Sequence, residues 1–301
     1  MDYKKLIRSQ KLRFRIMHYL SWVPDSVMLR VQYRIKMGFW PDFKHPKRYT
    51  EKLQLYKMRY RNPVMPQCVD KYEVRKYVKS KGLGQILNEL YGVYDSFDEI
   101  DFNSLPDKFV IKSTTGGGGF NVIAVKDKNT CNWEEIGLNV NAWGQHKKGT
   151  VNPGREWAYS DMDKTRIIIE KYLEDKKEKS LVDYKFFCFN GEPRYLYVIA
   201  DRKHGAYAYL SIYDTQFNKT PYYRSDERKL ERSMPKPVHF EKMLEVARTL
   251  SADLPHVRVD LYNIDGRIFF GELTFYDGSG YFHYEPDSFD FEAGSYFTEY
   301  I

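Results

Sequence analysis

The chain has 301 residues, 42% of them hydrophobic, and its 48 Lys and Arg against 41 Asp and Glu give a formal net charge of +7. This length can bury a sizeable core that divides into two or three lobes. Three scattered cysteines without CxxC spacing favour a reducing compartment and argue against a zinc site. No apolar run approaches the length of a membrane span, and the amino-terminal stretch lacks the apolar core of a signal peptide. We therefore predict a cytoplasmic protein.

Basic residues gather near the start of the sequence. Residues 1–66 contain 16 Lys and Arg but only 4 Asp and Glu, and apolar residues are interspersed among them. We predict a basic helical extension here. It could contact the inner face of an anionic cell membrane or an acidic partner, or it could pack on the rest of the chain with its basic face in water. Nucleic acid is not a predicted partner, because no zinc-finger or RRM-type motif accompanies the charge.

The spacing of apolar residues predicts an α+β chain. Helices are expected over 25–37, 50–61, 70–82, 131–143 and 239–252. Strands are expected over 86–93, 108–113, 121–125 and 165–173, and as hairpins over 183–202 and 257–275. Hairpins among helices favour α+β over a doubly wound parallel sheet. The expected units are the extension 1–66, a small subdomain 67–105, a first lobe 106–173 and a carboxy-terminal lobe 174–301.

The last hairpin, VRVDLYNIDGRIFFGELTF over 257–275, combines an apolar face with a charged one. A two-residue turn at Asp265-Gly266 would set Asp260 opposite Gly271 and send Glu272 to the far face. A three-residue loop over 264–266 sets Asp260 opposite Phe270 instead, and we predict that register. The face that results carries Arg258, Asp260, Glu272 and Thr274. These residues could form a surface salt bridge or a functional site.

Four consecutive glycines, Gly116, Gly117, Gly118 and Gly119, join two of the expected strands. Backbone N–H groups of such a loop can approach phosphate oxygens, and Lys112 on the preceding strand is a candidate phosphate cation. Three nucleotide-binding patterns fail here. No Gly-Lys-Ser/Thr follows the glycines, the HRD and DFG motifs of protein kinases are missing, and the loop leads into a strand and not into a Rossmann helix.

The remaining pattern resembles the ATP-grasp superfamily, and specifically its TupA-like branch, named for teichuronopeptide biosynthesis. Five stretches in matching order carry the resemblance across roughly residues 40–290. They are DKYEVRKYV, GVYDSFDEIDFNSLPDKFVIKSTTGGGGFNVI, REWAY with RIIIEKYL, DYKFFCFNGEPRY and VRVDLYNIDGRIFFGELTFYDGSG. The resemblance implies the ATP-grasp fold, in which two α+β lobes grip ATP, preceded here by the helical extension.

The resemblance also implies roles for single residues in nucleotide binding. Lys71 and Lys112 match the lysines that hold the ATP phosphates, and the loop 116–119 would close over them. The adenine hinge corresponds to Glu170, Lys171, Tyr172 and Leu173. Asp183 stands where such enzymes place an acid on the ribose hydroxyls.

Metal and phosphate roles follow in the same way. Asp260 and Glu272 match the magnesium ligands, and Arg258 matches an arginine near the transferred phosphate, so Arg258 and Lys112 are the expected catalytic residues. Thr274 departs from the family pattern, because many ATP-grasp enzymes have Asn at this position. A hydroxyl can still bind magnesium, directly or through water, which suits an ion that takes one or two carboxylates plus phosphate oxygens.

The reaction implied by the resemblance is ATP- and Mg²⁺-dependent joining of a carboxylate to an amine through an acyl phosphate. The expected acceptor is a small-molecule or glycan carboxylate, such as a uronic-acid-type sugar in surface polysaccharide synthesis. No Ser-His-Asp or Cys-His set is evident in the sequence, and this reaction needs none. Arg202 and the backbone of Gly278, Ser279 and Gly280 are candidate contacts for the acceptor.

Three alternatives remain open at this stage. The same ATP site could phosphorylate a glycan hydroxyl. Asp161 and Asp163 have the DxD spacing of a metal-dependent glycosyltransferase, although that short pattern is common by chance. The chain could also be an inactive ATP-grasp scaffold. No oligomeric state is predicted.

Overall fold

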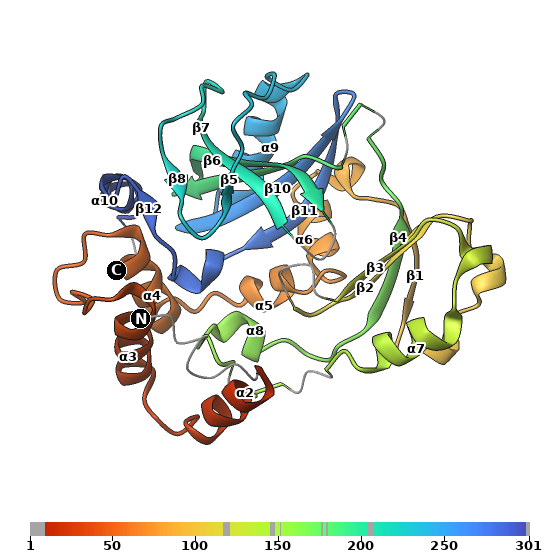
Figure 1. The fold of residues 1–301 in the computed structure, drawn as a ribbon, viewed down its shortest axis with the longest axis horizontal. Coiled ribbons are helices and arrows are strands. Elements are labelled where there is room, and N and C mark those ends of the chain that lie inside the picture. The colour runs from red at the N-terminus through yellow and green to blue at the C-terminus, as the bar shows by residue number, and fades with distance from the viewer. Residues whose placement is uncertain are drawn as a thin grey trace.

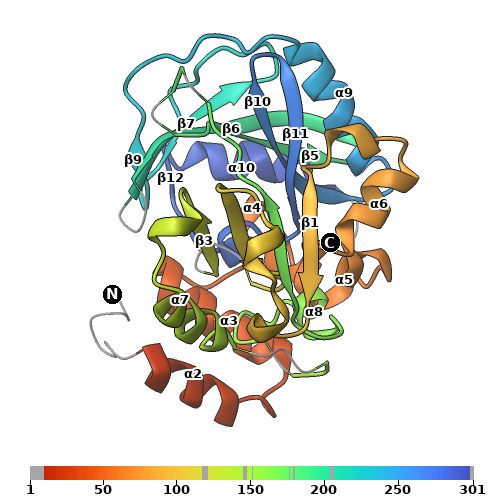
Figure 2. The same ribbon diagram turned by 90° about the vertical axis from the view of Figure 1, so that its right-hand side faces the viewer.

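The computed structural model describes residues 10–116, 121–144, 148–150, 152–175, 177–178, 180–203 and 207–298. Two β-sheets organise the described chain, one of four strands and one of six, with helices around them (Figure 1). A view turned by 90° shows helices α2 (Gln10–Tyr19) and α3 (Asp25–Met37) together, on the side away from the six-stranded sheet (Figure 2). The α+β class expected from the sequence is confirmed.

The four-stranded sheet is antiparallel throughout. Its spatial order is β1 (Leu90–Tyr94), β4 (Ile167–Lys171), β2 (Phe109–Ser113) and β3 (Val122–Val125). Burial alternates along β2, so Phe109 and Ile111 enter a core covered by α7 (Trp133–Asn141), while Lys112 points to the opposite face. β1 lies in the predicted subdomain 67–105, yet it pairs with β4 in this sheet.

The six-stranded sheet contains both predicted hairpins. Its order is β11 (Arg267–Thr274), β10 (His256–Ile264), β5 (Asp183–Phe189), β6 (Glu192–Lys203), β7 (Tyr207–Asp214) and β9 (Arg228–Lys229), antiparallel except for the β7–β9 pair. Helix α9 (Phe240–Ser251) packs on one face through Met243, Ala247 and Leu250, which recur at helical spacing and are fully buried. The other face carries the charged side chains of β10 and β11. β8 (Tyr223–Arg224) and β12 (Tyr284–Glu285) form a separate pair.

Helices from both ends of the described chain pack together. α4 (Tyr49–Arg59) lies against α10 (Ser288–Tyr296), and the carboxylate of Asp290 accepts hydrogen bonds from the backbone N–H of Thr50 (3.0 Å) and from its hydroxyl (2.8 Å). The remaining helical segments are α5 (Val64–Val69), α6 (Val74–Ser80), α8 (Trp157–Ser160) and the 3₁₀ turns η1 (Gly84–Ile86), η2 (Phe97–Glu99), η3 (Phe102–Ser104), η4 (Lys128–Thr130) and η5 (Asp277–Gly280).

Each helix in the described part of the chain is too short or too polar to cross a bilayer.

Several elements differ from the sequence prediction. The helix expected over 70–82 is only α6, because the carboxylate of Asp70 accepts from the backbone N–H of Tyr72 (2.8 Å) and Glu73 (2.9 Å) and holds a turn there. The strand expected over 86–93 begins only at Leu90, after the turn η1. The elements β7, β8, β9, β12, α5, α8 and α10 were not predicted from the sequence.

The predicted register of the last hairpin is wrong, both at the turn and in pairing Asp260 with Phe270, but the prediction that Arg258, Asp260, Glu272 and Thr274 share one face is right. Ile264 pairs with Arg267, so the turn has only two residues, Asp265 and Gly266, with φ of +51° and +84°. A bulge at Gly271 then shifts the pairing and brings Asp260 opposite Glu272. A Cβ at Gly271 would lie 3.0 Å from the carbonyl oxygen of Asp260, so glycine permits this close approach.

The contact between α10 and α4 predicts a steric requirement at Gly294. A Cβ there would overlap the carbonyl oxygen of Lys47 and lie 2.8 Å from the backbone nitrogen of Tyr49. We expect Gly294→Ala to lower the free energy of unfolding by about 3 kcal/mol, measured by urea denaturation, although alanine is the better helix former. Gly144→Ala is the control because nothing lies within 4 Å of its Cβ. Equal stability of the two variants would contradict the close packing.

Candidate functional site

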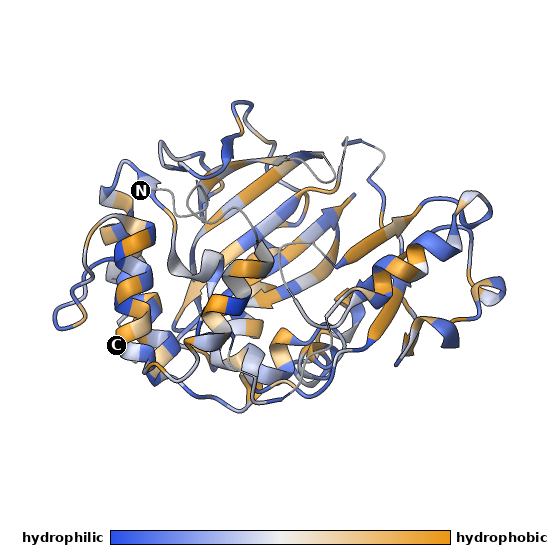
Figure 3. Cartoon of the chain, turned by 60° about the horizontal axis from the view of Figure 1, so that its bottom comes forward, coloured by the Kyte–Doolittle hydropathy of each residue, from blue (hydrophilic) through white to orange (hydrophobic). Residues whose placement is uncertain are grey.

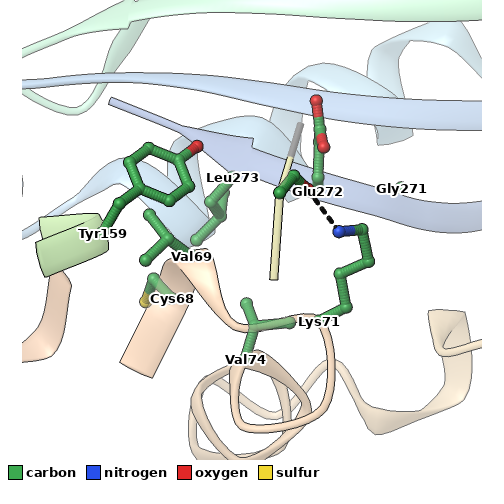
Figure 4. A pocket seen from close by; sticks show the side chains of 9 residues that line it. Cys68, Val69, Lys71, Val74, Tyr159, Gly271, Glu272 and Leu273 are labelled. Carbon is green, nitrogen blue, oxygen red and sulfur yellow. Dashed lines mark hydrogen bonds between the residues drawn. The ribbon is translucent and has the colours of Figure 1, made fainter. Parts of the chain in front are cut away.

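A cleft of about 480 Å³ opens between the two sheets. One wall consists of residues from β2, β4 and the segment after β4, and the other consists of residues from β10 and β11. The lining residues are Lys71, Arg75, Leu87, Asn88, Lys112, Glu170, Leu173, Tyr262, Phe270 and Gly271. A smaller adjoining pocket includes Lys71, Gly116, Tyr159 and Glu272 (Figure 4). Cationic, carboxylate and apolar side chains therefore converge in one cleft.

Lys71 stands where the two pockets meet. Its backbone N–H donates to the carbonyl of Thr114 (3.0 Å), which ties the loop before α6 to the end of β2. Its ammonium group donates to the carbonyl of Gly116 (2.5 Å), and Figure 4 shows its side chain reaching toward the strand that carries Glu272. Burial lowers the pKa of Lys71, while the charge of Glu272 raises it. Gly117, Gly118 and Gly119 lie outside the described residues.

Lys112 and Glu170 face each other across β2 and β4. The ammonium group of Lys112 lies 2.7 Å from one carboxylate oxygen of Glu170, and the guanidinium of Arg75 lies 3.0 Å from the other. Arg75 also donates to the carbonyl of Asn88 (2.7 Å). Lys112 is thus held at the cleft by a carboxylate, with its side chain still 28% exposed.

The four predicted hinge residues do not share one environment. Glu170 and Leu173 line the cleft. Lys171 has an exposed side chain that pairs with Glu89 at 3.1 Å, and its backbone N–H and C=O are bonded to Glu89 (2.9 Å) and Asn88 (2.8 Å). Tyr172 is half-buried just after β4. The backbone of Lys171 is therefore already paired within the protein.

Asp183 begins β5 and lies beside Tyr262 of β10. Its carboxylate binds the guanidinium of Arg202 (2.7 Å) and lies 3.6 Å from the ammonium of Lys185. Arg202 was expected to contact the acceptor and Asp183 to contact the ribose of ATP, but the structure joins these two side chains in one ion pair. The other acceptor candidates, Gly278 to Gly280, follow the opposite end of β11, so the structure does not bring the four together.

Arg258 is the centre of the charged face. Its guanidinium donates to Asp260 through two nitrogens, at 2.7 Å each, and also contacts Glu272 (2.9 Å) and the hydroxyl of Thr274 (3.0 Å). A further ion pair joins it to Asp277. All four predicted residues of the hairpin face are therefore in direct contact, and the surface salt bridge considered above is instead a buried network, with Arg258 only 8% exposed.

The two acids of the hairpin differ in their pKa. Burial raises the pKa of Asp260 to about 6, against the opposing charges of Arg258 and Lys185. Burial acts in the same direction on Glu272, but Lys185, Arg258 and Lys71 together lower the pKa of Glu272 to about 2. Lys185, which forms an ion pair with Asp260, therefore belongs to the site.

Ion pairs extend this network beyond the predicted residues. Asp277 also binds Arg224 (3.2 Å), which in turn binds Asp226 (2.6 Å). The connected set contains five carboxylates and four cations, namely Asp183, Asp226, Asp260, Glu272 and Asp277 with Lys185, Arg202, Arg224 and Arg258. Lys71 adds a further positive charge near Glu272.

The donor set of Asp260, Glu272 and Thr274 fits magnesium. Oxygen ligands from one or two carboxylates are typical of this ion, which completes its shell with water and phosphate. Among the described residues, no three His, Cys, Asp or Glu side chains gather as an all-protein site would require. The DxD pair is placed less favourably. The Asp163 side chain is 88% exposed and pairs with Lys148 at 3.4 Å, and Asp161 follows α8.

Sequence reasoning missed Arg75, Lys185, Arg224 and Asp277. Lys185 could have been found from strand alternation, because it lies two residues after Asp183 and shares its face. Arg75 meets Glu170 and Arg224 meets Asp277 across 95 and 53 residues of sequence, a separation at which strand alternation gives no signal.

The loop of Gly278, Ser279 and Gly280 rests on α4. Lys57 is fully buried, and its ammonium donates to the carbonyl (2.6 Å) and hydroxyl (2.8 Å) of Ser279 and to the side chain of Gln54 (3.1 Å). Gln54 also donates to the carbonyl of Gly280 (3.1 Å). The three loop residues have φ of +49°, +56° and +70°, so α4 supports a loop with left-handed backbone.

Comparison with known proteins identifies the family. Residues 51–298 match the family described as TupA-like ATP-grasp. The chain therefore belongs to the TupA-like ATP-grasp family. The match confirms two expectations from the sequence, namely the resemblance to the TupA-like branch and the ATP-grasp fold. No curated protein sequence matches the chain.

The chain is also similar to several solved structures of ligases. D-alanine–D-alanine ligase from Bacillus anthracis is 19% identical, with a TM-score of 0.42 over 69% of this chain and 56% of that one. The corresponding enzyme from Helicobacter pylori is 14% identical, with a TM-score of 0.45 over 85% of this chain and 68% of that one. N5-carboxyaminoimidazole synthetase from Staphylococcus aureus, complexed with ADP, is 12% identical, with a TM-score of 0.41 over 69% and 44%. The chain thus spans between 44% and 68% of the length of these structures.

The buried position of Lys57 predicts a pH-dependent stability. Burial lowers the pKa of Lys57 to about 7, with Glu156 opposing, whereas the unfolded chain keeps the usual 10.5. Between these values the unfolded state binds one more proton, so the free energy of unfolding should rise with pH, by up to about 1.4 kcal/mol per pH unit. We expect urea denaturation between pH 7 and 9 to show this rise in the wild type and in the exposed variant Lys79→Met, but not in Lys57→Met. Parallel curves for all three would show that Lys57 stays charged.

Proposed function

We propose that this chain is an ATP- and Mg²⁺-dependent ligase that joins a carboxylate to an amine. One observation carries the proposal. Lys71 and Lys112, which are expected to bind the phosphates of ATP, line the cleft between the sheets, and so does the strand that bears Glu272. Asp260 is the partner of Glu272 on the neighbouring strand. Separate positions for these four side chains would have removed the basis for an ATP site.

The residues of the cleft suit the parts of a nucleoside triphosphate. Lys71 and Lys112 supply positive charge from two different segments, which suits a polyphosphate lying between them. Leu87, Leu173 and Phe270 provide apolar surface beside these cations, as a purine base requires. Asp260, Glu272 and Thr274 would hold Mg²⁺, which neutralises phosphate charge when bound.

The proposed reaction needs no nucleophile from the protein. A carboxylate oxygen of the acceptor attacks the γ-phosphorus of ATP, the bond to the β-phosphate oxygen breaks, and ADP leaves. The amine then attacks the carbonyl carbon of the acyl phosphate, inorganic phosphate departs, and the amine gives up a proton. Cys68 lies next to Lys71 in the smaller pocket, but burial raises the pKa of its thiol to about 12, which argues against a covalent thiolate route.

We further propose that the acceptor is a carboxylate on a sugar and that the product belongs to surface polysaccharide. The resemblance to the TupA-like branch supports this choice. Buried Arg258 would support charge on the transferred phosphate once the acids around it also bind metal. The proposal places the reaction on the cytoplasmic side of the membrane, where ATP is available.

Nucleotide binding is tested by thermal stability with and without ATP and Mg²⁺. A ligand that binds the native state at a hundred times its Kd adds about 2.7 kcal/mol of stability. We expect ATP with Mg²⁺ to raise the Tm of the wild type and of Lys108→Met, an exposed control on the approach to β2. The same addition should leave the Tm of Lys112→Met nearly unchanged, because this variant lacks the ammonium group that Glu170 holds at the cleft. A full shift in Lys112→Met would contradict the assigned phosphate site.

Ligation is tested by trapping the acyl phosphate. With ATP, Mg²⁺, hydroxylamine and a panel of uronic acids, a ligase releases ADP and forms a hydroxamate. A kinase on the same site would release ADP and yield a phosphorylated sugar without hydroxamate, and that result would replace the ligase proposal. ATP binding with neither product from these acceptors would remove the support for a sugar carboxylate.

A further inference from the structure

Exposed hydrophobic side chains are concentrated in one part of the molecule. Of the ten large hydrophobic residues that are exposed in the described part of the chain, seven fall between residues 12 and 40. They are Leu12, Tyr19, Trp22, Val27, Val31, Ile35 and Trp40, whereas Leu138, Val238 and Phe291 are widely separated in the sequence. Single exposed hydrophobic residues are ordinary, but such a concentration marks an interaction surface.

Helix α3 is apolar on both sides. Its inner face is buried through Met28, Leu29, Gln32, Tyr33 and Met37. Val27, Val31 and Ile35 recur every four residues and so form one stripe on the outer side, where they are between 41% and 50% exposed. Figure 3 brings this side of the molecule forward and shows α3 with hydrophobic bands next to hydrophilic ones.

Tryptophans flank this stripe at both ends of the helix. Trp22 precedes α3 and is 79% exposed, and Trp40 follows it and is 63% exposed. Indole rings are costly to leave in water, and they are enriched where a protein meets the headgroup region of a bilayer. We call the stripe, the two tryptophans and the arginines described next the α3 surface.

The charge around the stripe is positive. Arg30 and Arg34 are exposed on the same side of α3, and Arg15, Lys44 and Lys47 are exposed nearby in the sequence. The acidic residues between 10 and 48 are Asp25 and Asp42. Asp25 is paired with Arg155 at 3.0 Å, and Asp42 accepts hydrogen bonds from the backbone N–H of Lys44 and His45. Both carboxylates are therefore occupied within the protein.

We propose that the α3 surface binds an anionic lipid bilayer, with the apolar stripe and tryptophans in the headgroup region and the arginines on lipid phosphates. Basic residues beside an apolar helix face are the combination that anionic lipid interfaces attract. A second copy of this chain fits less well, because a two-fold contact would bring Arg30 and Arg34 close to the same arginines of the other copy. This inference is independent of the proposed reaction.

The α3 surface is linked to the candidate acceptor loop. On the inner side of α3, Gln32 donates to the carbonyl of Pro153 (2.9 Å) and accepts from the hydroxyl of Tyr281 (2.9 Å). Tyr281 directly follows the loop of Gly278 to Gly280. A protein docked through α3 would therefore hold this loop one helix away from the lipid surface.

Vesicle sedimentation with the full chain tests the proposal. Wild-type protein is mixed with vesicles of phosphatidylcholine alone, or with about one quarter phosphatidylglycerol to supply anionic headgroups. The test variant is Val31→Glu with Ile35→Glu. The matched control is Leu138→Glu with Val238→Glu, at positions that are equally apolar and more exposed but lie elsewhere. Because all four positions are exposed, thermal melting should show that both variants keep the wild-type Tm.

We expect anionic vesicles to bind at least about tenfold more wild-type protein than zwitterionic vesicles, with binding weakened by salt. The test variant should lose about tenfold in bound fraction, and the control should bind as the wild type does. Arg30→Gln with Arg34→Gln should lose the preference for anionic vesicles, which keeps the test decisive if the glutamate variant unfolds. Three results would overturn the proposal. The first two are equal binding of the wild type to both kinds of vesicle and an equal loss of binding in the control variant. The third is a wild-type dimer that does not bind vesicles and that Val31→Glu with Ile35→Glu dissociates.

Discussion

The site depends on one buried guanidinium. Arg258 is surrounded by the carboxylates of Asp260, Glu272 and Asp277. It stays ionised because these negative charges offset the cost of removing its guanidinium from water. Burial lowers the pKa of Arg258, but Asp260 and Asp277 hold this pKa above its usual range. Each acid is in turn fixed by Arg258, Lys185 or Arg224. The cluster therefore fixes the positions of these carboxylates before any ligand arrives.

The hairpin shows how far sequence patterns reach. Alternation along 257–275 correctly predicted which side chains share a face, because one face must be buried and the period of a strand is two. It failed on the turn, since a two-residue turn and a bulge at Gly271 give the same facing as the three-residue loop that we predicted. The alternation thus determined which side chains are buried, but it did not determine the type of turn or the position of the bulge. The strand that carries Lys112 was also predicted correctly, because its signal is local.

Contacts between distant segments could not be predicted in this way. Lys57 and Ser279 are 222 residues apart and meet only because α4 packs under η5. Arg75 reaches Glu170 across the space between α6 and β4, and Asp277 meets Arg224 through a separate strand pair. Such partners are chosen by tertiary packing, and a basic residue on a helix carries no sign of which acid it will meet. The resemblance to a family predicted roles for residues in the matching stretches, but it did not predict these supporting contacts.

The capping of α4 by Asp290 has a consequence for how the chain folds as it is made. The first turn of α4 carries backbone N–H groups that need an acceptor, and the carboxylate that serves Thr50 is 240 residues further along the chain. During synthesis, α4 leaves the ribosome long before its partner does. The hydrogen bonds from Thr50 to Asp290 can therefore form only after α10 has been synthesised.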